Sequence, residues 1–186
     1  MSSNIQIHDI VITEQLSDRS YRNRNADLEK QAFQQLAKQS SYGAQAILNA
    51  LCDLTLSLCD ADSSGVSLLQ VVDGEDGFTW NAMAGSMASY VGGRAPRHHS
   101  PCGYCLERGA AQLYSYPERF FEWMRLVGKP IVEGMVIPLY GKDKNAIGTI
   151  WMISHRDGHQ FDRYDLQIIS IFANHASAAL RMQELY

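Results

Sequence analysis

The strongest constraint on the fold is the way the spacing of apolar residues changes along the chain. From Asp27 apolar residues recur at helical spacing, and after a break at 40–43 a second helical stretch follows. The pattern then alternates over 65–72 and 78–85, and the glycine-containing turn at 73–77 joins these two segments into an antiparallel hairpin. A chain that changes period in this order predicts helices packed against an antiparallel sheet.

The last third of the chain predicts a second hairpin and a terminal helix. Segments 134–140 and 146–155 are rich in aliphatic residues, which favours central strands covered on both faces, and Pro138 implies a local break in the ladder. Asp162 is a natural cap for a helix over 162–185, which carries one apolar stripe for the sheet and another for a helix or a second subunit. The two stripes are Leu166, Ile169, Phe172, Ala176 and Leu180, and Ile168, Ile171, Ala178, Met182 and Leu185.

Between the hairpins, residues 86–131 leave the sheet in a long crossover. Local rules predict a short helix there, because Ser100 can cap it, Pro101 suits its first position and Gly109 can end it in the left-handed conformation. We further expect a short strand over 112–116 and a helix over 117–126. Ordered segments of this length usually carry function, so the crossover is the predicted place of a site.

Length and charge limit the class of protein. The 186 residues predict an N-terminal extended arm over 1–26 and one domain over 27–186, and within the arm residues 5–12 alternate like an edge strand or a docked extended segment. A net charge of −4 argues against binding nucleic acid or an anionic membrane, and no apolar run is long enough to cross a bilayer. We therefore expect a cytoplasmic protein with reduced cysteines.

The order of elements, together with a set of motifs, resembles a GAF domain with its core over 43–182. The motifs that carry the resemblance lie at 58–69, 136–139, 147–151 and 161–165. Further motifs resemble the GAF input module of bacterial sensor histidine kinases and related two-component proteins, and they lie at 100–103, 116–120 and 129–133 and at Thr13, Leu16, Arg19 and Arg22.

The resemblance implies an α+β, PAS-related fold. Its central antiparallel sheet of five or six strands would carry the terminal helices on one face, and the crossover would roof a ligand pocket on the other. Family members hold cyclic nucleotides, linear tetrapyrroles, small metabolites or haem there. The Cys-His pair common in bilin-binding members is missing, because Gly103 follows Cys102 and Leu106 follows Cys105. The Asn-Lys-Phe-Asp element of the cyclic-nucleotide subtype is also absent near Phe161, so the cofactor stays unknown.

The candidate ligand-binding residues lie in or beside the crossover. They are Trp80, Arg97, His99, Ser100, Cys102, Tyr104, Cys105, Phe121 and Trp151. Arginines there can hold an anion by fork-like hydrogen bonds, and aromatic side chains can line a pocket for a flat ligand, although a solvated rim and a packed core are the plainer explanations. We predict no catalytic residue.

The two thiols of the crossover leave alternatives open. With His98 and His99 they resemble a zinc ligand set, but two cysteines on one short helix leave little room for both imidazoles to close a tetrahedron, so we predict no metal. Cys102 and Cys105 at a helix start also suit a redox pair, or the thiol chemistry of the free methionine sulfoxide reductases, a GAF branch. The plainer interpretation is packing, as for Cys52 and Cys59.

The function that these observations favour is a non-catalytic GAF-type sensory domain. It would bind a small ligand in the roofed pocket and form a homodimer through its terminal helices. It would signal through those helices to a histidine kinase or regulator in a two-component type pathway. A thiol-based redox sensor or reductase and a pure dimerisation or protein-interaction domain are the alternatives.

Overall fold

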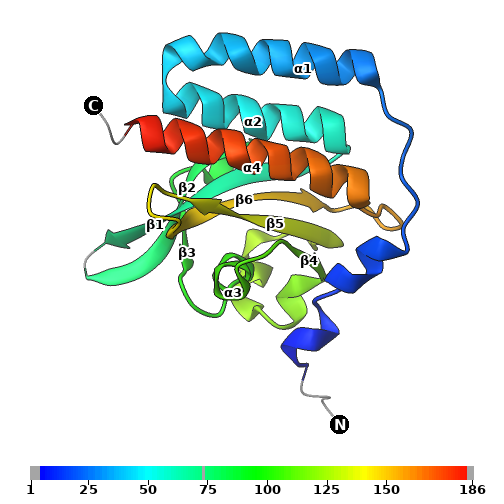
Figure 1. Ribbon diagram of the computed structural model, residues 1–186. Coiled ribbons are helices and arrows are strands. Elements are labelled where there is room, and N and C mark those ends of the chain that lie inside the picture. Colours follow the sequence, from blue (N-terminus) through cyan, green and yellow to red (C-terminus); the bar gives the residue numbers. More distant parts are fainter. Residues whose placement is uncertain (1–4, 73, 184–186) are drawn as a thin grey trace.

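The computed structural model describes residues 5–72 and 74–183 and has the predicted order of elements (Figure 1). These described residues form four α-helices and six strands, which are α1 (Ala26–Gln39), α2 (Ala44–Cys59), β1 (Ser63–Val72), β2 (Glu75–Gly85), β3 (Arg94–Pro96), α3 (Pro101–Arg108), β4 (Gln112–Ser115), β5 (Glu133–Tyr140), β6 (Ala146–Ser154) and α4 (Arg163–Gln183). Short 3-10 turns connect them. The predicted α+β fold is confirmed.

The six strands form one antiparallel sheet in the order β3-β2-β1-β6-β5-β4. Helices α2 and α4 cover one face, with α1 packed on the outer side of α2, and α3 with the rest of the crossover covers the other face (Figure 1). Alternation along β6 places Ile150 and Met152 in the core beneath the helices, and Trp151 and Ile153 in a second core beneath the crossover. Both faces of the central strands are therefore buried, as the aliphatic pattern predicts.

The edge of the sheet at β4 explains how Pro138 is accommodated. β4 pairs with β5 only over Glu133–Val136, so Pro138 lies beyond the last paired residue and its missing N–H costs no bond to β4. The N-terminal arm runs beside β4 as a docked segment of 3-10 turns, Ile7–Asp9 and Thr13–Ser17, with a single bridge between Val11 and Tyr114. Residues 5–12 are therefore docked beside β4, but they are not extended as expected, because Ile7–Asp9 forms a 3-10 turn.

Two local predictions need correction. The helix expected over 117–126 is replaced by two 3-10 turns, Pro117–Arg119 and Glu122–Val127, because Phe121 leaves helical geometry and turns its ring into the core beneath the crossover. The first hairpin is also longer than expected, since β2 begins at Glu75 in place of Phe78, and Asp73 lies outside the described residues.

Helix α4 begins as predicted and distributes its two stripes between core and surface. Ile169, Phe172 and Ala176 are fully buried, and so is Ile168 of the second stripe. Met182 is 62% exposed, and Leu185 lies outside the described residues. None of the helices in the described part of the chain combines the length and apolarity that crossing a bilayer requires.

Candidate functional site

Helix α3 is built by the local rules that the sequence shows. The Ser100 hydroxyl oxygen accepts a hydrogen bond from the Gly103 N–H at 3.0 Å, Pro101 occupies the first turn, and Gly109 ends the helix with a left-handed backbone. Gly103 lies so close to the Arg97 carbonyl that a Cβ would overlap its oxygen. These contacts hold the start of α3 against the β3–α3 loop.

Beneath α3 and the two 3-10 turns the structure encloses a cavity of about 60 Å³. The sheet supplies Trp80, Ala95, Tyr114, Gly134, Val136, Trp151, Met152 and Ile153. The crossover supplies Met87, Ser100, Pro101, Cys102, Pro117, Trp123, Met124, Val127 and Ile131. The cavity thus lies between the sheet and the crossover, where a roofed recess is expected.

Several polar atoms in the cavity wall are already paired within the protein. Trp151 Nε1 donates to Ser67 Oγ at 2.9 Å, and the Tyr114 hydroxyl donates to the Pro101 carbonyl at 2.9 Å. The Ser100 hydroxyl accepts the capping bond of α3. The wall is therefore apolar in character.

Two side-chain hydrogen bonds hold the roof together. The Tyr90 hydroxyl donates to the Val127 carbonyl at 3.2 Å, and Trp123 Nε1 donates to the His99 carbonyl at 2.9 Å. His99 has a positive φ of 54°, a conformation that few residues other than glycine adopt. Separate parts of the crossover are joined in this way over the cavity.

The structure brings only some of the predicted site residues together. Trp80, Ser100, Cys102 and Trp151 line the cavity. Cys105 and Phe121 are fully buried in the same core without lining the cavity, and Tyr104 is partly buried against that core.

Arg97 and His99 lie outside the cavity wall. The Arg97 guanidinium lies 3.5 Å from the Gly103 carbonyl oxygen and 4.0 Å from Glu107 Oε1. The His99 ring packs against those of Phe120 and Phe121, with centroids 5.1 and 5.4 Å apart. Both side chains therefore have structural partners.

The thiols of α3 are in an environment that disfavours the thiolate. Burial raises the pKa of Cys102, although Thr149 Oγ1 lies 3.1 Å from its sulfur, and burial raises the pKa of Cys105 as well. All four cysteines are free thiols, and Cys52 and Cys59 are fully buried. Within 5–72 and 74–183, no three His, Cys, Asp or Glu side chains are grouped so that they could hold a metal ion.

A second cluster of polar side chains joins the N-terminal arm to the sheet. Arg19 forms a bidentate pair with the Glu133 carboxylate, with nitrogen–oxygen distances of 2.6 and 2.9 Å, and both side chains are at most 10% exposed. Arg19 also donates to the Phe161 carbonyl, and the Phe161 N–H donates to Glu133. Because Glu133 begins β5 and Phe161 precedes α4, this pair joins three distant segments.

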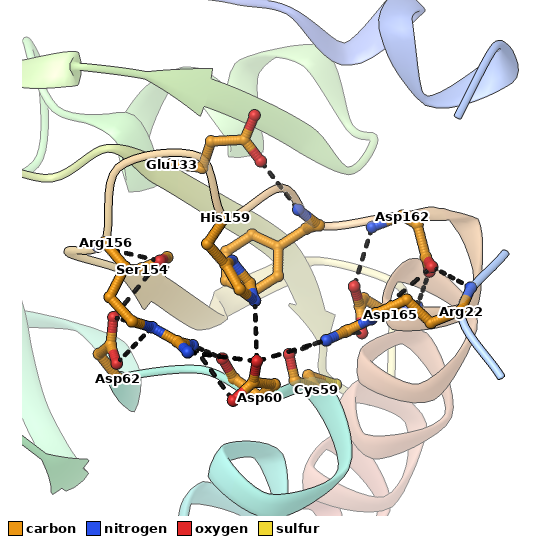
Figure 2. Close-up of polar contacts among 11 residues, drawn as sticks. Arg22, Cys59, Asp60, Asp62, Glu133, Ser154, Arg156, His159, Asp162 and Asp165 are labelled. Carbon is orange, nitrogen blue, oxygen red and sulfur yellow. Dashed lines mark hydrogen bonds and ion pairs between the residues drawn. The ribbon is translucent and has the colours of Figure 1, made fainter. Parts of the chain in front are cut away.

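Arg22 extends this cluster to the start of α4 (Figure 2). The Arg22 guanidinium pairs with Asp165 and donates to the Cys59 carbonyl at 2.8 Å. The backbone N–H of Arg22 donates to the Asp162 carboxylate at 2.6 Å. Asp162 accepts from the Asp165 N–H while Asp165 accepts from the Asp162 N–H, which is a reciprocal cap of the helix. Burial raises the pKa of Asp165 to about 6, against the lowering effects of the Asp162 N–H and Arg22.

The remaining part of the cluster surrounds the end of β6 (Figure 2). Asp62 accepts from the His155 N–H at 2.7 Å and from Arg156, and these bonds outweigh the effect of burial, so the pKa of Asp62 is lowered. His159 Nε2 lies 3.4 Å from Asp60. This cluster lies at the end of the sheet where β5 begins and β6 ends, next to Gly134 and Ile153 of the cavity wall.

The molecule is therefore a sheet with helices on one face and a roofed cavity on the other. A sequence profile described as "GAF domain" matches residues 43–181, so the chain belongs to the GAF domain family. No curated protein sequence shows significant similarity to it.

Solved structures share the fold. The GAF domain of a phosphoenolpyruvate-protein phosphotransferase (ptsP) from Coxiella burnetii has a TM-score of 0.72 at 15% identity, over 86% of this chain and 94% of that one. The second GAF domain of DevS from Mycobacterium smegmatis has a TM-score of 0.60 at 16% identity, over 76% and 95%. The Stigmatella aurantiaca phytochrome photosensory core module has a TM-score of 0.61 at 13% identity, over 88% of this chain and 39% of that one.

Sequence reasoning did not single out several parts of the site. Met87, Met124, Val127 and Ile131 line the cavity, but an apolar residue in an irregular segment gives no signal of which surface it will face. The sequence pointed only indirectly to the ion pair of Arg19 with Glu133, because both residues lie in motifs that resemble the sensor-kinase input module. The sequence gives no indication that these motifs meet in space.

Proposed function

We propose that this chain is a non-catalytic sensory domain that binds a small molecule in the cavity beneath the crossover. The observation that carries the proposal is that cavity, because its wall combines sheet residues with crossover residues. A molecule bound there would stabilise the closed arrangement of the roof relative to any open one. Relatives named as photosensory and chromophore-binding support a sensory role.

A path of contacts supports signalling through the terminal helices. Ile131 and Gly134 line the cavity and flank Glu133, which binds Arg19 and the Phe161 N–H directly before α4. A change in the cavity wall would alter the position of Glu133 and, with it, the start of α4. We propose that α4 and α1 carry this change outward, in a homodimer and toward a histidine kinase or regulator of two-component type.

Thermal unfolding with a panel of neutral and charged metabolites tests the proposal. We expect at least one compound to raise the Tm of the wild type and of Ala88→Leu, whose changed side chain is exposed, but not of Ala95→Leu, whose added atoms would fill the cavity. The same compound should slow hydrogen exchange in the first turns of α4. A panel without any such compound would contradict ligand binding, and unchanged exchange in α4 would contradict the signalling route.

Light scattering tests the dimer. We expect a dimer at micromolar concentration that Met182→Lys weakens, because Met182 is a large exposed apolar residue on α4. A monomer would remove this part of the proposal. The exposed Leu126→Lys, on the opposite side of the sheet, is the matched control.

A further inference from the structure

We infer that the cavity binds a small, uncharged and apolar molecule, and that it rejects anions. The inference rests on the proposed function, because it specifies the ligand class of the same cavity. It departs from the ligand that the arginines of the crossover suggest, which is an anion.

The composition of the wall is the first observation. Among the described residues that line the cavity, none is Asp, Glu, Lys, Arg or His, and the polar side-chain groups of the wall are few. An ionised group placed there would lose its hydration without gaining a counter-charge, which is far more costly than burying an apolar group. Arg97, the predicted partner for an anion, lies outside the wall beside Gly103 and Glu107.

The second observation is that three side-chain donors of the wall are already used. Trp151 Nε1, Trp123 Nε1 and the Tyr114 hydroxyl each donate to a protein acceptor. A polar ligand could pair only with the few donors that remain, those of Ser100 and Trp80, and its other polar atoms would be buried without a partner, which weakens binding. The wall therefore discriminates by polarity as well as by charge.

The size of the cavity is the third observation. One water molecule needs roughly 10–15 Å³ by this measure, and an apolar cavity that holds benzene measures about 150 Å³. The cavity here offers about 60 Å³, so a hydrocarbon ring enters only if the wall widens. Apolar cavities of this kind stay dry and accept small apolar solutes. The side chains of Met87 and Met124 line the crossover side, and because methionine is unbranched and flexible they can adapt to a compact ring.

The test uses three probes of similar size, cyclopentane, isobutyramide and isobutyrate, which are apolar, neutral polar and anionic. All three tryptophans of the chain line the cavity, so tryptophan fluorescence responds to binding there and gives a Kd for each probe. In protein labelled with ¹³C at the methionine methyl groups, Met87 and Met124 report binding. Met135 in the core beneath the helices and the exposed Met182 are internal controls.

We expect cyclopentane to shift Met87 and Met124 saturably without moving Met135 or Met182. Isobutyramide should bind at least about tenfold more weakly, because about 1.4 kcal/mol of unpaired amide corresponds to a factor of ten. Isobutyrate should not shift these methyl groups. Cavity-filling Ala95→Leu should lose the response to cyclopentane, and Cys102→Leu serves as a second filling variant should the first not fold.

The outcomes separate this inference from the proposed function. Binding of isobutyrate at Met87 and Met124 with the affinity of cyclopentane would overturn the apolar class while leaving a ligand-binding cavity in place. A second outcome is that no probe gives a response while a charged or strongly polar compound from the metabolite panel stabilises the wild type. That result would also overturn only the ligand class. No response to probes or panel would overturn both.

Discussion

At Trp151 a single side chain fixes the floor of the cavity. Its ring lies across Gly65 on the neighbouring strand, where a Cβ would overlap the ring, and its Nε1 donates to Ser67. The ring is 5% exposed and therefore cannot leave this position without opening the core beneath the crossover. Glycine at position 65 is thus required by a close approach of side chain to backbone.

Cys102 tests whether the chain performs thiol chemistry. Because burial raises its pKa, little thiolate exists near neutral pH, and we expect alkylation by iodoacetamide at pH 8 to be at least about tenfold slower than for an exposed cysteine. Mass spectrometry of modified peptides measures the rate. The urea-unfolded chain, in which all four cysteines are exposed, is the control, and rapid native alkylation of Cys102 would favour the redox alternative.

At the scale of elements, α3 shows how a short helix is held by its first turn. Ser100 caps it, and Gly103 packs against the Arg97 carbonyl, so the β3–α3 loop and the helix form one unit. This unit carries Ser100, Pro101 and Cys102 into the cavity wall. The position of the wall therefore depends on the start of α3.

Gly103→Ala tests that dependence. The added methyl group would overlap the Arg97 carbonyl, and we expect a loss of unfolding free energy of about 1–3 kcal/mol, together with a changed tryptophan emission as the cavity wall moves. Urea unfolding measures the loss. Arg108→Ala, an exposed change on the same helix, should alter stability by less than about 0.5 kcal/mol, and an equal loss in both variants would contradict the close-contact argument.

The first turn of α4 predicts a pH dependence. The folded pKa of Asp165, about 6, lies above the ordinary value of 3.8, so the folded state holds this proton more tightly. The stability from this group is complete below about pH 4 and is lost as the pH rises through about 6. The difference amounts to about 3 kcal/mol at most, since one pKa unit corresponds to about 1.4 kcal/mol.

Asp165→Asn should remove this part of the pH dependence. Unfolding free energies measured in urea between pH 4 and pH 7.5 should fall with rising pH less steeply in the variant than in the wild type. Asp53→Asn, an exposed change on α2, should keep the wild-type profile. Identical profiles for wild type and Asp165→Asn would contradict the assignment.

At the scale of the whole molecule, the N-terminal arm joins segments that no single element connects. Thr13 accepts the Leu113 N–H at β4, Leu16 is buried in the core beneath the helices, and Arg19 and Arg22 pair at the starts of β5 and α4. These four residues are the N-terminal part of the sensor-kinase resemblance. Their shared role in the structure is to attach the arm.

Arg19→Met tests how much the arm contributes. It leaves the buried Glu133 carboxylate without its counter-charge, and we expect a loss of about 3–5 kcal/mol in urea unfolding. Arg24→Met removes an exposed pair with Glu29 and should cost less than about 1 kcal/mol. Adding Glu133→Met to Arg19→Met should recover part of the loss, and a loss no larger than that of Arg24→Met would show that the arm is dispensable.

Local sequence patterns predicted most of the helices and strands, but not the short strand β3 or the start of β2. Periodicity places α2, α4 and the hairpins, and the caps at Ser100 and Asp162 act through residues two or three positions away, so local rules suffice. Local rules failed over 117–126, because Phe121 packs into a core formed by residues distant in sequence and therefore leaves helical geometry.

Tertiary structure alone decided the cavity and the attachment of the arm. Arg19 and Glu133 are 114 residues apart, and the cavity wall combines side chains from the sheet and from the crossover. The packing of the core beneath the helices and the core beneath the crossover decides which aromatic candidates line the cavity. It also decides whether Arg97 faces the cavity. Such packing is a property of many distant contacts at once, and no local pattern encodes it.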